Sequence, residues 1–327
     1  MRLAPLVMLL TAATIVTAVI ALCLAPDGDT LQLMPLISGK LSAIDRQLLL
    51  ELRLPRQLLA FCAGALLAAS GAAIQARFQN PLSEPGLVGI SGGAALAAAF
   101  ALQWMLPSPL VSVLAFSGGI GGLLLTWLMS RRAANGERLI LAGIAVNAIF
   151  GSLLTLRIVT LPDGSLRTIT FWLMGSFANA DWAQARLFLL LTPPLLALLY
   201  REWRLLNALQ LGLQSAFHLG FDARGGGLRI VLLAALAASL VVSNCGMVAF
   251  IGLMAPHLAR QLVGSHARRV LIAAPLLGGW LALLADTAAH ALLYPAELPV
   301  GVITSLAGAP FFLWLLWKNG KEGGWHA

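Results

Sequence analysis

Charged side chains are scarce in this chain: Asp, Glu, Lys and Arg make up 10% of its 327 residues, whereas 59% of the residues are hydrophobic. A soluble domain carries about 25% charged residues, because water has to solvate its surface. So few charges cannot cover a folded surface of that kind. The composition therefore excludes an ordinary soluble protein and indicates that lipid surrounds most of the chain.

Residues with the spacing of a chemical site are also missing. The three cysteines (Cys23, Cys62 and Cys245) are scattered in or beside apolar runs, so they predict neither a disulfide framework nor a metal site. The five histidines show no spacing typical of a metal centre or of a Ser–His dyad. The glycine-rich stretches 92–93 and 118–122 lack the Gly-Lys-Ser/Thr ending of a nucleotide-binding loop. We therefore expect no catalytic residue, no metal and no bound cofactor, so that any ATP used must be hydrolysed by another chain.

Long apolar runs, in contrast, are abundant. A helix needs about 20 mostly apolar residues to cross a bilayer, and the strands of a membrane barrel alternate in polarity, which these runs do not. Prolines 107 and 109 and the polar residues 244–246 are expected to divide the two longest runs. The sequence thus predicts an all-α polytopic membrane protein, a single domain over residues 1–327 with about ten transmembrane helices. The runs are Leu3–Ala25, Gln57–Ala76, Pro85–Ser130, Leu139–Leu156, Leu187–Tyr200, Ile230–Leu258, Val270–Ala285 and Leu298–Trp317.

Local signals predict the behaviour of several of these segments. Pro55 is expected to open the second helix, because the N–H that proline lacks would have no partner in a first turn. The small residues at 68–73 predict that this helix is buried, since they let membrane helices approach closely. Pro256 is expected to bar a regular helix at its position. The piece Phe171–Phe177 is too short to cross and predicts a re-entrant or interfacial helix on the outer side.

The net charge of +8 comes from basic residues that lie between the apolar runs. This distribution is the one expected from the positive-inside rule and does not indicate a nucleic-acid partner. With the N-terminus inside, most of the 21 Lys and Arg residues fall on inner loops. We therefore predict a multi-pass protein with both termini in the cytoplasm.

One polar segment, residues 201–229, separates a larger N-terminal set of apolar runs from a smaller C-terminal set. It carries Arg201, Arg204, Arg224 and Arg229. A polar segment of this length between two membrane spans has to lie in water. We expect it to be the surface on which a soluble motor protein docks.

Several stretches, taken together and in order, resemble the permease subunits of the ABC importers for iron–siderophore, haem and vitamin B12. They extend over almost the whole chain, and chain length agrees with the family as well. The matching stretches are Leu52–Arg56, Gln75–Leu82, Leu141–Gly143, Trp172–Gly175, Leu219-Gly220, Phe250–Leu253, Pro256-His257, Arg260, Ala285-Asp286, Glu297–Gly301 and Gly308–Pro310.

The resemblance implies a permease in the cytoplasmic (inner) membrane, paired with a second copy or a close relative of itself. Two ATPase subunits, which use ATP and Mg, would bind inside, and a periplasmic substrate-binding protein would bind outside. Alternating access would then move an iron chelate, haem or a siderophore, into the cytoplasm. Vitamin B12 is the alternative cargo. A stand-alone secondary carrier is a further alternative, although Asp286 is the only acid within a predicted span.

The resemblance also implies roles for particular residues. Arg53 and Arg56 match arginines that receive acidic residues of the binding protein, and His290 stands where the family usually has a third arginine. Asn80 matches a residue of the inner gate, and Pro81 stiffens the same loop. The coupling segment that contacts the ATPase is expected at Ser215, Ala216, Phe217, His218, Leu219, Gly220, Phe221, Asp222 and Arg224.

Two further arginines, Arg157 and Arg167, lie near the predicted outer mouth of the pathway. If they face the lumen, they could meet carboxylates of haem or of a siderophore. The alternative is that they extend to the outer lipid headgroups.

Overall fold

The computed structural model describes residues 3–23, 42–130, 136–293 and 296–321, and the regular structure within these ranges is helical. The helices in chain order are α1 (Leu3–Cys23), α3 (Ala43–Leu48), the π-helical turn η1 (Leu49–Arg53), α4 (Leu54–Phe78), the 3-10 turn η2 (Pro85–Val88), α5 (Ile90–Gln103), α6 (Ser108–Ser130), α7 (Gly136–Val159), α8 (Asp163–Leu173), α9 (Trp182–Arg201), α10 (Trp203–Leu209), α11 (Leu213–His218), α12 (Gly225–Cys245), α13 (Ile251–Val263), α14 (Ala267–Ala291) and α15 (Val300–Lys321).

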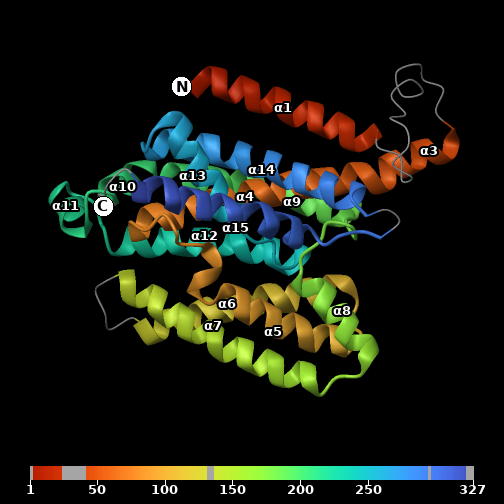
Figure 1. Ribbon diagram of the computed structural model, residues 1–327. Helices are drawn as coiled ribbons and strands as arrows, with labels where there is room; N and C mark the ends of the chain where they lie inside the picture. Colours follow the sequence, from red (N-terminus) through yellow and green to blue (C-terminus); the bar gives the residue numbers. More distant parts are fainter. Residues whose placement is uncertain (1–2, 24–41, 131–135, 294–295, 322–327) are drawn as a thin grey trace.

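Seven helical segments of the described chain are long and apolar enough to cross a membrane. They contain α1, α4, α6, α7, α9, α12 and α14. The shorter helices α5 and α13, of 14 and 13 residues, and the C-terminal helix α15 lie among them in the same bundle (Figure 1). The prediction of an all-α protein with about ten membrane helices is therefore confirmed in its architecture.

The helix α4 lies at the centre of the bundle, as its small residues predict. It packs against α9, α12, α13 and α14, and most of its side chains are buried. A Cβ atom added to Gly64 would lie 2.2 Å from the carbonyl oxygen of Gly278, and one added to Gly71 would lie 1.8 Å from that of Gly252. These helices touch backbone to backbone, which only residues without a side chain allow.

Figure 1 shows α5, α6, α7 and α8 on one side of this centre and α1 lying along α14 on the other. The helices α3 and α8 lie at one end of the bundle, which we call the α8 end. The opposite end, where α10 and α11 project, is called the α11 end. The beginning of α1 and the end of α15 both lie at the α11 end (Figure 1).

The divisions of the two longest apolar runs are confirmed. The helix α5 ends at Gln103 and α6 begins at Ser108, on either side of Pro107. The helix α12 ends at Cys245, and Gly246 follows with φ of 71°, a left-handed conformation that glycine adopts without steric cost.

Two local predictions are wrong, and a third holds only in part. Pro55 lies in the first turn of α4, as predicted, but helical backbone begins earlier, at Ala43, because the π-helical turn η1 joins α3 to α4 and its Leu49 carbonyl accepts a hydrogen bond from the N–H of Leu54. The short non-spanning helix lies at Asp163–Leu173, so residues 171–177 contain only its last turn. The helix α13 continues through Pro256.

The continuation of α13 through Pro256 has a tertiary cause. Proline cannot donate the helical hydrogen bond to the carbonyl four residues earlier, which here is the carbonyl of Gly252. The side-chain amide of Gln75, on α4, donates to that carbonyl at 3.3 Å, and the other end of the same amide accepts from Arg260. A neighbouring helix therefore satisfies the group that proline leaves unpaired.

Candidate transport and docking sites

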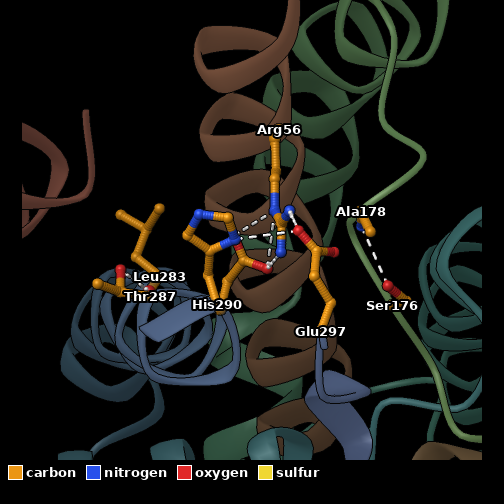
Figure 2. A network of polar contacts seen from close by, with 8 residues as sticks. Arg56, Ser176, Ala178, Leu283, Thr287, His290 and Glu297 are labelled. Carbon is orange, nitrogen blue, oxygen red and sulfur yellow. Dashed lines mark hydrogen bonds and ion pairs between the residues drawn. The ribbon is translucent and has the colours of Figure 1, made fainter. Parts of the chain in front are cut away.

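An ion-pair cluster at the α8 end joins α4 to α14 and to the loop before α15. Arg56 donates from Nε and Nη2 to both carboxylate oxygens of Asp286, at 2.8–3.1 Å. Its Nη1 donates to Glu297 at 3.0 Å, and the same Glu297 oxygen lies 3.0 Å from Nδ1 of His290 (Figure 2). We call these four residues the Arg56 cluster.

The two carboxylates of the Arg56 cluster differ in how far their side chains are buried. The side chain of Asp286 is 8% exposed and that of Arg56 15%, whereas that of Glu297 is 39% exposed. The pKa of Glu297 is nevertheless lowered: its partial burial raises the pKa, but the charge and hydrogen bonds of Arg56 and His290 outweigh that effect. Asp286 is thus a largely buried partner of Arg56.

The predicted docking residues are therefore close together but differ in their surroundings. Arg56 and His290 both contact Glu297, so an internal carboxylate already pairs with the guanidinium of Arg56 and lies against the imidazole of His290. Arg53 donates from Nη1 to the carbonyl of Leu22 at 2.6 Å and, within the described ranges, forms no ion pair. Among the described residues, the charge of Arg53 is therefore less neutralised than that of Arg56.

A cavity of about 640 Å³ opens near the α8 end and is lined mostly by α6, α8 and the chain segment after α8. Arg167 lines it, together with Thr168, Asn179, Asn244 and Glu297. The guanidinium of Arg167 also lies 5.7 Å from the ring centre of Phe171. One of the two predicted pathway arginines thus borders a polar hollow large enough for part of a ligand.

The other predicted pathway arginine has protein partners. Arg157 donates from Nε to Gln103 at 2.7 Å and from Nη1 to Thr160 at 3.0 Å. Its guanidinium lies 5.7 Å from the ring centre of Phe100. These contacts tie the end of α7 to the end of α5, which favours a structural role.

The predicted gate residue Asn80 lies in a compact turn directly after α4. Its side-chain oxygen accepts a hydrogen bond from the N–H of Leu82 at 2.9 Å, and its carbonyl accepts from Ser83 at 3.1 Å. Pro81, which is half-buried, lies between Asn80 and these two donors. We call residues 80–84 the gate loop.

The predicted coupling segment projects from the α11 end (Figure 1). Phe217 is 70% exposed and Leu219 is 60% exposed, while Ala216 is buried against the bundle. Gly220 has φ of 83°, which lets the chain turn back after α11. Of the other predicted contact residues, His218, Asp222 and Arg224 are exposed, and Ser215 and Phe221 are half-buried. Exposed apolar groups outside the membrane bundle indicate a protein-binding surface.

The sequence did not point to a second hollow, of about 580 Å³, which lies between η2, α7, α15 and the segment that follows α12. Glu84 and Asn147 line it, with Ser91 and Ser305 nearby. Asn147 holds its wall in place: its amide donates to the carbonyl of Gly86 at 2.9 Å and accepts from the N–H of Gly92 at 3.0 Å. A lone Asn within a predicted span was the available signal, since such a residue has to find partners in lipid.

Comparisons with known proteins agree with this arrangement. A profile described as the FecCD transport family matches residues 7–318. The chain is 41% identical over 281 residues to the hemin transport system permease of Yersinia pestis, with 84% of each chain covered. It is 40% identical over 275 residues to the vitamin B12 import permease of Pectobacterium atrosepticum, with 82% of each covered. A solved structure of a metal-chelate type ABC transporter in an inward-facing conformation matches with a TM-score of 0.86 at 31% identity, over 94% of this chain and 97% of that one.

Proposed function

This chain belongs to the FecCD transport family, and we propose that it is the transmembrane permease subunit of an ATP-driven importer that carries an iron chelate into the cytoplasm. The match over residues 7–318 carries this proposal, because it includes every site described above. The chain would act as a conduit, while a separate ATPase hydrolyses ATP with Mg. Similarity alone leaves the cargo open between haem or a siderophore and vitamin B12, since a haem permease and a vitamin B12 permease are almost equally similar.

The polar cavity at the α8 end supports an anionic iron chelate as cargo. Arg167 supplies a positive charge on its wall, and the hydroxyl and amide groups around it can accept or donate hydrogen bonds. Haem and many siderophore complexes carry carboxylates or other anionic oxygens, which an arginine binds well. Vitamin B12 offers mainly amides and would use the neutral polar groups of the same wall.

We place the ATPase at the α11 end. Phe217 and Leu219 project there as apolar side chains that a cleft on a soluble partner could bury. The α11 end would accordingly be cytoplasmic, and both termini would share that side, because α1 begins and α15 ends there (Figure 1). The α8 end would then face the periplasm.

We place the substrate-binding protein at the α8 end, over Arg53 and the Arg56 cluster. Acidic groups of that protein would pair with Arg53 directly. At Arg56 and His290 they would have to replace Glu297, the more exposed of the two carboxylates that Arg56 holds.

A second copy of the chain would close the pathway. Asn147 of α7 and Leu306 of α15 line the same hollow, and both helices expose large apolar side chains, among them Leu141 and Leu306, at 65% and 67%. A partner subunit placed against these helices would cover the hollow and bury those side chains.

Reconstitution tests the proposal. The permease is placed in proteoliposomes with the ATPase and binding protein of its own organism, and uptake of haem, a ferric siderophore and vitamin B12 is measured with and without ATP. We expect ATP-dependent uptake of an iron chelate only when all three proteins are present. Uptake by the permease alone, without nucleotide, would show a stand-alone carrier, and uptake of vitamin B12 only would establish the alternative cargo.

A further inference from the structure

Gln79 occupies an unusual position at the junction between α4 and the gate loop. Its φ is 53°, in the left-handed region that residues with a side chain rarely adopt. Its backbone N–H donates to the carbonyl of Gln75 and so closes the last turn of α4. A conformation of this kind is kept only where surrounding contacts hold it.

The contact that holds Gln79 comes from the end of α10, directly before the turn that leads into the coupling segment. Its side-chain Nε2 donates to the carbonyl of Leu209, the last residue of α10. That carbonyl also accepts from the N–H of Gly212, which begins the turn into α11. A carbonyl oxygen has two lone pairs and can accept both bonds. Gln79 is therefore attached at the turn that joins α10 to the exposed α11.

The gate loop follows Gln79 without a break. The N–H of Asn80 donates to Gln75 at 3.1 Å, and Asn80 in turn accepts from Leu82 and Ser83. Residues 79–83 thus form one hydrogen-bonded turn. A displacement of Gln79 would be passed to Asn80 and Pro81 as a movement of the whole turn.

Within the described residues, α10 and the turn after it form other hydrogen bonds to neighbouring elements, but these lead to the start of α14 and not to the gate loop. Asn207 bonds to His266 and Ala267, and Gln210 donates to the carbonyl of Ser265 at 3.2 Å. These bonds fasten α10 to the start of α14. The bond from Gln79 is the one that reaches the gate loop.

We propose that Gln79 is the positioning residue through which movement of the coupling segment reaches the gate loop, by its side-chain hydrogen bond to the Leu209 carbonyl. This inference rests on the proposed ABC import function. ATP-driven displacement of α11 moves the α10–α11 turn, and the Gln79 amide pulls the gate loop with it. Without this bond the ATPase still hydrolyses ATP, but a smaller part of the movement of α11 is transmitted to the gate loop.

The test uses the complete complex of permease, ATPase and binding protein in proteoliposomes, with uptake and ATP hydrolysis measured on the same vesicles. Gln79→Glu keeps the length of the side chain and removes the donor. Gln79→Gly removes the side chain and also suits the positive φ, so it relieves backbone strain and favours folding. For both variants we expect uptake per ATP hydrolysed to fall about five- to tenfold, the scale of one lost hydrogen bond, while ATP hydrolysis stays within about twofold of the wild type.

Gln210→Ala is the matched control, because it removes an amide-to-carbonyl bond from the same turn that leads to Ser265 instead. We expect its uptake per ATP to equal that of the wild type. The inference is overturned if both Gln79 variants couple normally, or if Gln210→Ala loses as much coupling as they do. A wild-type complex that shows no ATP-dependent uptake would instead refute the import function itself.

Discussion

Arg56 and Asp286 form a bidentate ion pair that fastens α4 to α14, although the two residues lie 230 positions apart in the chain. Both side chains are largely buried, and a buried charge that loses its partner is costly. We therefore expect Asp286→Asn to destabilise the protein by about 2 kcal/mol or more. Thermal unfolding in detergent, followed by tryptophan fluorescence, measures this loss.

Glu297→Gln is the control for that prediction. Glu297 contacts the same arginine but is 39% exposed, and ion pairs near the surface contribute about 1 kcal/mol or less. The thermal midpoint of the Glu297→Gln variant should stay close to that of the wild type. Equal losses from the two variants would mean that the pair of Arg56 and Asp286 is not the main fastening of α4 to α14.

The Arg56 cluster also predicts an asymmetry in docking. Because Arg53 has no internal carboxylate partner among the described residues, Arg53→Ala should weaken binding of the substrate-binding protein more than Arg56→Ala does. Glu297→Gln removes a carboxylate that competes for Arg56, and it should tighten binding by about two- to fivefold at low salt. Surface plasmon resonance with the permease in nanodiscs measures all three affinities. Weaker binding by Glu297→Gln would show that Glu297 supports docking and does not compete with it.

How far the sequence predicts this protein depends on the distance over which each contact acts. The apolar runs predict the helices, because hydropathy and length are local properties, and Gly246 and Pro107 mark two helix ends correctly. The path of α13 through Pro256 could not be predicted, since the amide that satisfies Gly252 comes from Gln75 on another helix.

The site residues show the same limit. The polarity of residues 201–229 predicts a segment between membrane spans, whereas the pairing of Arg56 with Asp286 requires the packing of α4 on α14. The contact between Arg157 and Gln103 likewise depends on how α5 meets α7. Polar residues within spans can be recognised in the sequence, but their partners are set by helix packing.

The exposed apolar side chains of the coupling segment predict that apolar contacts contribute to ATPase binding. Phe217→Ala and Leu219→Ala should each leave the thermal midpoint of the permease unchanged, because neither side chain is buried within it. In the complex they would be buried, and a central apolar contact contributes about 2 kcal/mol, or roughly 30-fold in affinity. Co-purification with the ATPase and titration of its binding measure the loss. Leu211→Ala is the control variant, since Leu211 is 68% exposed but lies outside the predicted contact at 215–224. If Leu211→Ala weakened ATPase binding as much as the other two variants, the contact surface would extend towards α10.

The different surroundings of Arg167 and Arg157 give the last prediction. Arg167 lines the cavity at the α8 end, whereas Arg157 is held by Gln103 and Thr160. If the cargo is an anionic iron chelate, Arg167→Ala should lower its uptake about tenfold, the scale of one charge-assisted hydrogen bond, while Arg157→Ala should leave uptake nearly unchanged. Arg167→Lys keeps the charge and should recover part of the loss. Initial uptake rates in proteoliposomes, at matched ATP hydrolysis, measure the effect. An unchanged rate in Arg167→Ala would remove Arg167 from the cargo path, and a loss confined to Arg157→Ala would place the path along the end of α7.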